Sequence, residues 1–421
     1  MGRRQRSAAE EQVAGLLRTA KDALGLSIAF LSRMDGTTQH LQVVDSTVPF
    51  IFQEGHQAVQ ATSLCQAIRD GRLPPVMPDL RQHPLAMTLP ATRFPRLRSY
   101  VSVPVTLSDG TFYGTFCAAG LTTDKGLGER DRALLEVLAS AAAVVVEPEV
   151  VAAAERADVV GRIQPVMAAG GPTVVLQPIV ALADGVRVGA EALSRFPAEW
   201  GRTPDLVFAE AHAHGLGDEL ELLALERAVA HLDGVQGYVA MNVSPQTLLT
   251  PGCAALLARL PARRVLLELS EHDPVEDYDA LHAALAGPRA AGLRLAIDDV
   301  GAGFSSLRHI VLCRPDVIKL DRSIVAGVAT DDVLSTLVTA LVQFAHGSGT
   351  TVVAEGVETF DDVVALRALG VDLGQGWYFG RPGPAADLER APAVVAPAVV
   401  APVLPRPASP GDEVVLPARV R

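Results

Sequence analysis

The sequence predicts an α/β fold, in which a TIM-type (β/α)8 barrel with one irregular strand pair follows a smaller α+β domain. A length of 421 residues suits two domains. Eight apolar runs begin at Thr173, and most are separated by segments long enough for a crossover helix, as in such a barrel. Only "ALADG" separates the first two runs, whereas a parallel crossover needs about a dozen residues. We therefore expect the first two strands to form an antiparallel hairpin.

Composition restricts the class of protein. Apolar residues make up 49% and charged residues 20%, which allows a substantial core. The net charge of -12 argues against a nucleic-acid polymer as partner, although a small phosphate ligand is compatible if cations neutralise it. The four cysteines form no CxxC pair and indicate free thiols. With no secretory signal, and with Val137–Val146 too short to span a bilayer, we expect a cytoplasmic protein without a membrane partner.

The first element is an α+β domain over residues 8–147. The segment Glu10–Leu24 has helical spacing. Four runs predict strands: "LSIAFLSR", "LQVVDS", "YVSVPVTL" and "GTFYGTFCAAG". Asp109 and Gly110 form the turn signal of a hairpin between the last two.

A helical linker over residues 148–170 joins the two domains. The segment Gly128–Val146 predicts a helix that ends near Pro148, and a second helical segment follows over Val150–Ile163. The barrel domain is expected over residues 171–390. Beyond it, residues 391–421 repeat Ala-Pro-Ala-Val-Val, and proline at this density predicts a disordered or extended tail.

The barrel strands end in polar residues. The eight runs are "TVVLQPIV", "RVGAEALSRF", "YVAMNVS", "VLLELSE", "LRLAIDD", "VIKLD", "TVVAEGVE" and "DLGQGWYF". Their polar residues are Gln177, Glu191, Asn242, Glu268 with Glu271, Asp298 with Asp299, Lys319 with Asp321, Glu355 with Glu358, and Gln375. Active sites of such barrels form at the C-terminal strand ends, so these groups are expected around one mouth.

This set of groups predicts a metal site. Packed carboxylates repel one another and need cations. Oxygen ligands without cysteine or histidine at ligand spacing favour Mg²⁺ or Mn²⁺, and two adjacent aspartates suit two neighbouring metals that act on a phosphate ester. A single acid is more often a helix cap or a solvated turn, but caps need not fall on successive strand ends. The set as a whole therefore favours chemistry.

The motif "EALSRF", Glu191–Phe196, resembles the signature of the EAL-domain cyclic di-GMP phosphodiesterases. The resemblance continues in family order over roughly residues 173–385, through "LQPIV", "MNVS", "LELSE", "IDDVGAGFSSL", "VIKLDRS", "VVAEGVET" and "GQGWYFGRP". It implies a modified barrel with one antiparallel strand. It also implies metal-dependent hydrolysis of cyclic di-GMP to linear pGpG.

The resemblance assigns roles to the polar residues. The implied metal ligands are Glu191, Asn242, Glu268, Asp298 and Asp299, with Asp298 bridging two Mg²⁺ or Mn²⁺ ions. Lys319 would hold the attacking water, Glu355 would complete the metal and water shell with a possible role as base, and Gln375 would orient the water or its ligands. Glu271 would anchor the loop after Asp299. The implied substrate contacts are Gln177, Leu193 and Arg195.

The sequence departs from the family pattern at several positions. Val300 stands for the usual Phe and Phe304 for the usual Tyr. The stretch between Glu191 and Asn242 is short, and His212 stands where an Ala-Glu pair normally ends. None of these changes removes an implied ligand.

The N-terminal domain resembles a GAF domain, through "YVSVPVTLSDGTFYGTFCAAG" and "SLCQAIRDGRLPPVMPDL". The candidate ligand contacts are Cys65, His40, His56 and His83, although a structural role is the better expectation for each. The ligand is unknown. We expect this domain to regulate the barrel within a homodimer.

Two other functions fit the same resemblance: a catalytically inactive EAL domain that serves as a cyclic di-GMP receptor, and a protein-interaction scaffold. Degenerate domains usually lose a metal ligand or the lysine, and all are present in this chain. The sequence has no GGDEF-type segment, so we expect no cyclic di-GMP synthesis. An active phosphodiesterase is therefore the leading hypothesis.

Overall fold

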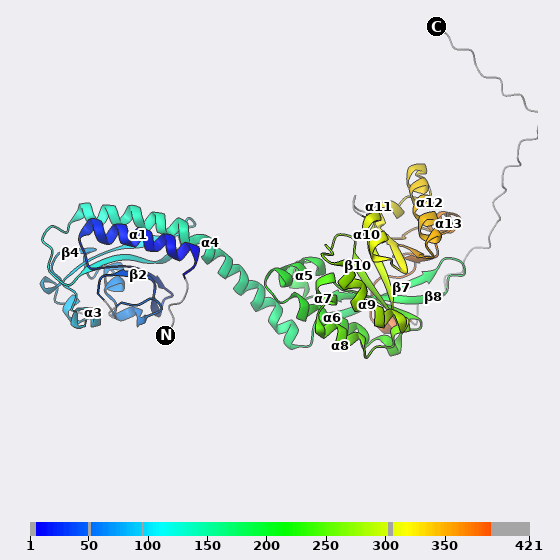
Figure 1. Cartoon of the computed structure of the whole chain (residues 1–421), viewed down its shortest axis with the longest axis horizontal. Coiled ribbons are helices and arrows are strands. Elements are labelled where there is room, and N and C mark those ends of the chain that lie inside the picture. Colours follow the sequence, from blue (N-terminus) through cyan, green and yellow to red (C-terminus); the bar gives the residue numbers. More distant parts are fainter. Residues whose placement is uncertain (1–5, 49–51, 95, 302–305, 389–421) are drawn as a thin grey trace, which may run out of the picture. The chain divides into compact units, whose positions relative to one another are not determined.

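The computed structural model describes residues 6–48, 52–94, 96–301 and 306–388 (Figure 1). The backbone divides into two compact units, Met1–Asp158 and Val159–Arg421. The predicted tail and Phe304 lie outside the described residues.

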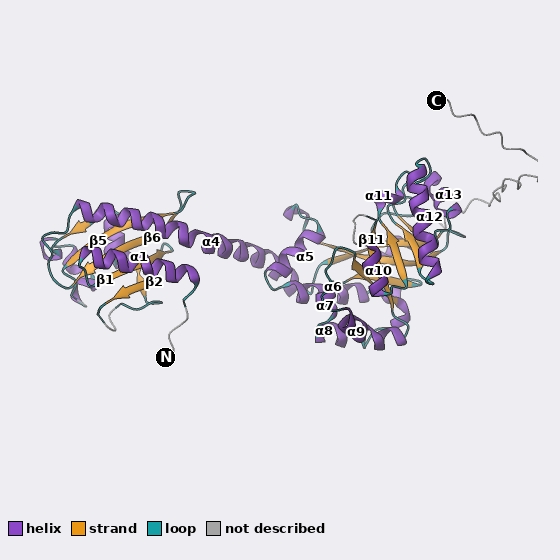
Figure 2. Ribbon diagram, turned by 45° about the horizontal axis from the view of Figure 1, so that its top comes forward, coloured by secondary structure: helices purple, strands orange, loops and turns teal. Residues whose placement is uncertain are grey.

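The first unit is built on a six-stranded antiparallel sheet with strand order β3-β2-β1-β6-β5-β4 (Figure 2). The strands are β1 Ile28–Met34, β2 Thr38–Ser46, β3 Gln57–Val59, β4 Val76–Met77, β5 Ser99–Thr106 and β6 Phe112–Gly120. The helices are α1 Ala8–Leu24, η1 Gln60–Thr62, α2 Leu64–Arg69, η2 Leu80–Gln82, η3 Ala86–Thr88 and α3 Pro90–Arg93. The α+β prediction is confirmed. The edge strands β3 and β4 were not predicted, because segments of three and two residues carry no periodicity.

Each face of this sheet has its own core. Helix α1 begins with a capping box between Ser7 and Glu10 and packs its buried face on one side of the sheet, beside the first part of α4 (Figure 1). The other side packs on residues from the segments between β2 and β5. There Cys65 is buried and lies 3.0 Å from the Tyr100 hydroxyl, whereas His56 is exposed and His40 pairs with Asp35. A ligand role for these side chains stays a prediction.

Helix α4 runs without interruption over Glu129–Ala168. The prediction that a helix ends near Pro148 is therefore wrong. Proline leaves the carbonyl of Val144 without its helical donor, but Val144 is 72% exposed, so water can replace the lost hydrogen bond. Good helix formers on both sides then allow the helix to continue.

Helix α4 also bears on the membrane question. Among the described residues it is the one helix long and apolar enough to cross a membrane by length and composition. That test alone is weak evidence. The continuous helix is longer than the apolar segment Val137–Val146 that the sequence showed.

The second unit contains a closed barrel with strand order β10-β11-β12-β13-β14-β7-β8-β9. Its strands are β7 Thr173–Ala181, β8 Arg187–Arg195, β9 Tyr238–Asn242, β10 Val265–Ser270, β11 Arg294–Val300, β12 Val317–Leu320, β13 Thr351–Ala354 and β14 Leu373–Gln375. Strand β7 is antiparallel to both neighbours, β8 and β14, and the other pairs are parallel. The predicted barrel with one antiparallel strand is confirmed.

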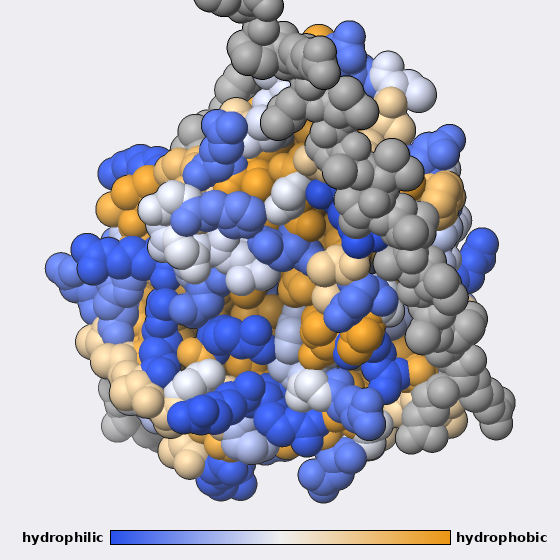
Figure 3. All heavy atoms as spheres, turned by 90° about the vertical axis from the view of Figure 1, so that its right-hand side faces the viewer, coloured by the Kyte–Doolittle hydropathy of each residue, from blue (hydrophilic) through white to orange (hydrophobic). Residues whose placement is uncertain are grey.

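Helices cover the outside of the barrel (Figure 2). They are α5 Pro204–Ala213, α6 Gly217–Val229, α7 Pro245–Leu248, α8 Pro251–Leu257, α9 Tyr278–Ala290, α10 Ser306–Cys313, α11 Arg322–Val325, α12 Asp332–Gly347, α13 Phe360–Ala368 and α14 Ala385–Leu388, with short 3-10 turns η4 Ala198–Trp200, η5 Leu232–Gly234 and η6 Ala262–Arg264. The main core lies between strands and helices. On one face of the molecule, hydrophobic and hydrophilic side chains are interspersed (Figure 3).

Candidate active site

Strand alternation places the polar residues on the same face as a small apolar cluster. That cluster consists of Ile179, Tyr238, Ala240, Leu266, Ala296, Val317 and Val353. All but Tyr238 lie two residues from a polar strand-end residue, as Leu266 does from Glu268, and Tyr238 lies four residues before Asn242. Residues two apart in a strand face the same side. The barrel interior is therefore apolar beneath a polar mouth.

The antiparallel strand obeys the same rule in reverse. Gln177 precedes Ile179 in β7, whereas Glu268 follows Leu266 in β10. Because β7 runs the other way, its N-terminal part lies at the mouth, and Gln177 pairs with Glu191 of β8.

A bulge in β11 explains the adjacent aspartates. The register between β11 and β12 shifts between Ile297 and Val300, so Asp298 and Asp299 leave the regular alternation. Asp299 has a φ of 59°, a left-handed conformation that is uncommon for a residue other than glycine. Its backbone N–H donates to Oδ1 of Asp298 at 2.9 Å. The bulge thus lets two successive carboxylates serve one site.

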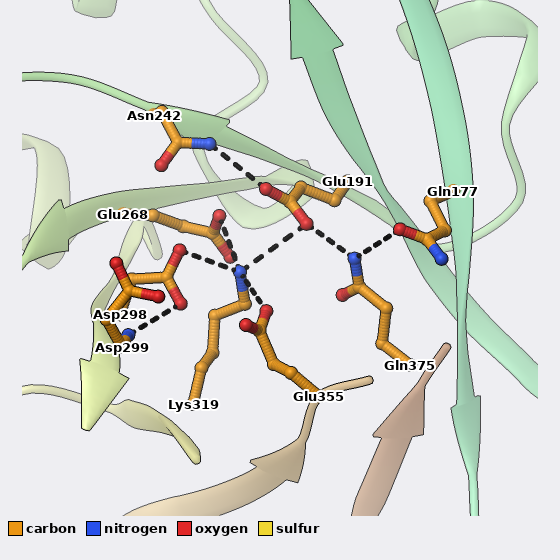
Figure 4. Close-up of polar contacts among 9 residues, drawn as sticks. All are labelled: Gln177, Glu191, Asn242, Glu268, Asp298, Asp299, Lys319, Glu355 and Gln375. Carbon is orange, nitrogen blue, oxygen red and sulfur yellow. Dashed lines mark hydrogen bonds and ion pairs between the residues drawn. The ribbon is translucent and has the colours of Figure 1, made fainter. Parts of the chain in front are cut away.

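Lys319 lies at the centre of the site (Figure 4). Its side chain is 1% exposed. The ammonium Nζ lies 2.7 Å from Glu355, 3.0 Å from Glu268, 3.1 Å from Asp298 and 3.5 Å from Glu191. A buried ammonium among four carboxylates must be charged, and accordingly these carboxylates raise the pKa of Lys319 well above its ordinary value despite the opposing effect of burial.

Two amide side chains orient Glu191. Asn242 Nδ2 donates to Oε1 of Glu191 at 3.0 Å, and Gln375 Nε2 donates to Oε2. Gln375 also donates to Oε1 of Gln177 at 3.1 Å (Figure 4). The carboxylate of Glu191 thereby links β9, which carries Asn242, to β14, which carries Gln375.

Burial raises the pKa of most acids in the site. It raises the pKa of Glu355 to about 8 and that of Asp299 to about 6, with a further contribution from the charge of Asp298 in both cases. The pKa values of Glu268 and Asp298 are also raised, chiefly by burial. Glu191 is the exception, since Lys319 and the amide hydrogen bonds outweigh burial and lower its pKa. One buried ammonium is too little positive charge for this set.

The site fits divalent cations. Two sets of carboxylates have oxygens within 4.8 Å of one another: Glu191, Glu268 and Asp298, and Asp298, Asp299 and Glu355. Asp298 belongs to both. Among the described residues, Glu268 Oε1 and Gln375 Oε1 are buried acceptors without a hydrogen-bond partner. Unsatisfied oxygens and excess negative charge are what hard divalent ions require.

A cavity of about 310 Å³ opens beside these carboxylates. Of the predicted residues, Gln177, Glu191, Leu193, Asp298, Glu355 and Gln375 line it. The structure adds Arg322, Glu358 and Trp377, of which Glu358 was noted in the sequence only as a strand-end acid. Arg322 forms an ion pair with Glu358 at 3.0 Å. The ion pair could not be inferred from sequence, because it depends on how the start of α11 meets the loop after β13.

Two predicted residues lie apart from both the cavity lining and the groups that surround Lys319. Arg195 ends β8, and its guanidinium donates to the carbonyl of Ser194 at 2.8 Å. Glu271 is buried, and its backbone N–H donates to the carbonyl of Asp298 at 3.1 Å. The second contact ties Glu271 to the bulge, whereas no contact places Arg195 at the cavity. The roles of both residues stay predictions.

Comparison with known proteins gives a family match for each part of the chain. Residues 161–382, more than half of the chain, match the model of the EAL domain, and residues 8–147 match a GAF domain. The chain is 34% identical over 230 residues to the cyclic di-GMP phosphodiesterase NbdA of Pseudomonas aeruginosa, covering 51% of this chain and 29% of that protein. It is 30% identical over 227 residues to the probable cyclic di-GMP phosphodiesterase PdeB of Escherichia coli K12, covering 51% and 43%. This chain thus spans less than half of either relative.

A solved structure gives a further match. The manganese and cyclic di-GMP complex of BlrP1 from Klebsiella pneumoniae is 32% identical, with a TM-score of 0.45, over 50% of this chain and 56% of that one. The family match covers the whole barrel, from the end of α4 to the segment after β14. The chain therefore belongs to the EAL domain family and carries a GAF domain before its EAL domain.

Proposed function

We propose that the protein hydrolyses cyclic di-GMP to linear pGpG with the aid of two divalent cations, Mg²⁺ or Mn²⁺. The observation that carries this proposal is the pair of overlapping carboxylate sets that share Asp298 around buried Lys319. A shared ligand holds two cations close together, the arrangement that suits phosphodiester hydrolysis. The names of the relatives NbdA and PdeB support the choice of substrate.

The residues divide the work as follows. Bound cations would supply the Lewis acidity that activates water and stabilises the leaving oxygen. Glu191, Asn242, Glu268, Asp298 and Asp299 would hold them. Lys319 reduces the repulsion between the carboxylates and orients the attacking water. Glu355 lies 2.7 Å from Lys319 and is placed to accept a proton from that water. Gln375 holds Glu191 in position.

The substrate would occupy the cavity beside these groups. Gln177 and Leu193 line it directly. Trp377 also lines it and is 52% exposed; the guanidinium of Arg381 lies over its ring, 4.3 Å from the centroid, so a guanine base would stack on the other face. Arg195 would have to move from its contact with Ser194 in order to reach a phosphate.

One assay tests the proposal. Purified protein is incubated with cyclic di-GMP and Mg²⁺ or Mn²⁺, and pGpG is separated by chromatography. We expect product with both ions and little with Ca²⁺, whose longer and looser coordination supports binding better than hydrolysis. Binding of cyclic di-GMP without pGpG under Mg²⁺ or Mn²⁺ would show a receptor. Neither binding nor product would leave the scaffold function.

We further propose that the protein acts as a homodimer regulated by its GAF domain, in the cytoplasm. Support comes from α4, where Val137, Val144 and Val151 are exposed at seven-residue spacing. Exposed apolar residues at this spacing favour a helix–helix interface. The double substitution Val137→Asp with Val144→Asp should shift the mass in light scattering from dimer to monomer. Ala153→Asp, at an exposed position outside this series, is the control. A wild-type monomer would refute the dimer.

A further inference from the structure

A buried carboxylate holds the turn that follows β9. Glu221 lies on α6, and its side chain is 10% exposed. Both the backbone N–H and the hydroxyl of Ser244 donate to its Oε2, each at 2.9 Å. Ser244 follows Asn242 by two residues and also caps α7. Two hydrogen bonds to one buried, charged oxygen form a strong attachment.

His212 orients this carboxylate from its other side. The Nε2 atom of His212 lies 2.6 Å from Oε1 of Glu221, and an ionised carboxylate only accepts, so the imidazole donates. The imidazole lies against Gly217, where an added Cβ would come within 2.2 Å of the ring. A residue without a side chain is therefore needed for the ring to lie there. This contact gives a partner to the histidine that departs from the family pattern.

The barrel holds the same turn from the opposite side. The backbone N–H of Val243 donates to the carbonyl of Glu268 at 3.0 Å, and Asn242 is paired with Glu268 in the register of β9 and β10. The side chain of Asn242 is itself exposed and donates to Glu191. An exposed neutral amide is a weak metal ligand unless its backbone is held in place. The strands hold this backbone on the barrel side, and Glu221 holds it on the side of α6.

We infer that Glu221, oriented by His212, is a positioning residue that places Asn242 for metal binding. The inference rests on the metal role of Asn242 in the proposed function. Glu221 belongs neither to the carboxylate sets nor to the described cavity lining, and its hydrogen bonds to Ser244 connect it to the site through the β9–α7 turn.

The test measures Mn²⁺ binding to the metal-free full chain by calorimetry, without substrate. Glu221→Ala should weaken Mn²⁺ affinity about tenfold to a hundredfold, the usual effect of losing a group that supports a ligand. Glu221→Gln keeps an acceptor for Ser244 and should fall between it and wild type. Glu219→Gln, an exposed acid in the first turn of the same helix, is the matched control and should leave affinity unchanged. If Glu221→Ala does not fold, Ser244→Ala is measured in its place, because it removes one of the two hydrogen bonds to Glu221.

A double-mutant cycle separates positioning from general stability. In an Asn242→Ala background, Glu221→Ala should cause no further loss of Mn²⁺ affinity, because the residue it positions is already gone. Lower thermal stability with unchanged Mn²⁺ affinity and unchanged kcat/KM would overturn the inference and show a structural role. A wild-type chain that binds no Mn²⁺ would overturn the proposed function together with the inference. Mn²⁺ binding that Glu221→Ala leaves intact would overturn the inference alone.

Discussion

The buried lysine and the bridging aspartate dominate the chemistry of single residues in this site. Lys319 neutralises part of the charge of four carboxylates, and Asp298 contributes oxygens to both carboxylate sets. Loss of a residue that serves two cations should cost more than loss of one that serves a single cation.

Asp298→Ala should lower hydrolysis by more than about a hundredfold, the upper end of what a merely supporting residue costs. Asp299→Ala should also be severe, but should act through one cation. Product formation and Mn²⁺ stoichiometry are measured together. Asp205→Ala, an exposed acid on α5, is the control. If Asp298→Ala retained two bound Mn²⁺ per chain, the bridging role would be wrong.

Lys319→Ala should lower kcat more than it weakens cyclic di-GMP binding, because Lys319 does not itself line the cavity and contacts the carboxylates from behind that lining. The expected loss in kcat is about a hundredfold or more, typical of a group that assists proton transfer. Steady-state kinetics measure kcat. Calorimetry on Asp298→Ala, with and without Lys319→Ala, measures cyclic di-GMP binding, and the comparison separates the two effects. A variant with normal kcat and weak binding would contradict this role.

Stability without metal should fall as pH rises. The pKa of Glu355 is about 8, above the ordinary 4.5 of a glutamate, so between these values the folded chain keeps a proton that the unfolded chain has released. The stabilisation is therefore complete below the ordinary pKa and is lost as pH rises through about 8. In EDTA, we expect the melting temperature to drop by several degrees between about pH 5 and about pH 8.5. Mn²⁺ should reduce the drop, and so should Glu355→Gln; a flat profile in EDTA would refute the shift.

At the scale of elements, the strands were predictable and their irregularities were not. Apolar runs located all eight barrel strands, and the short gap after Ala181 indicated the antiparallel pair. The bulge at Asp298 and Asp299 depends on the register with β12, which no local pattern carries. The same holds for Trp377 and Arg322, which line the cavity from the turn after β14 and from the start of α11. Helix α4 was divided wrongly, because a local proline rule was applied where the flanking turns support a continuous helix.

Pro148→Ala should stabilise α4, since it restores a donor for the carbonyl of Val144. The gain should be up to about 3 kcal/mol, the difference between proline and alanine in a helix interior. Hydrogen exchange of the amides around residue 148 and urea unfolding measure it. Glu155→Ala, on an exposed part of the same helix, should change little. A loss of stability would show that the proline is needed for the course of the helix.

At the scale of the whole molecule, two self-contained cores share one chain. Unit Met1–Asp158 has its own sheet, and unit Val159–Arg421 has a barrel that closes between β14 and β7. Leu388 lies in α14, which packs on β7, and is the last residue described. The barrel therefore closes within the described residues.

A chain that ends after residue 390 should therefore keep hydrolysis within about twofold of the full chain, since the barrel closes before that residue and changes outside the core cost little. Turnover and melting temperature of the two forms are compared under the same Mn²⁺ concentration. Loss of activity together with unfolding would show that the Pro-Ala-Val segment is part of the fold.

The reversed first strand has one more consequence. In a barrel of eight parallel strands the chain would enter at the base, far from the chemistry. Here β7 begins at the rim, where Thr173 pairs with Arg195, and four residues later Gln177 pairs with Glu191. The chain reaches this rim through Gly170 and Gly171. The guanidinium of Arg227 donates to the carbonyls of Ala169 and Gly170. A Cβ at Gly171 would lie 2.9 Å from Leu223. The segment that leads from α4 into the barrel therefore arrives at the mouth, in the strand pair that carries Gln177 and Glu191.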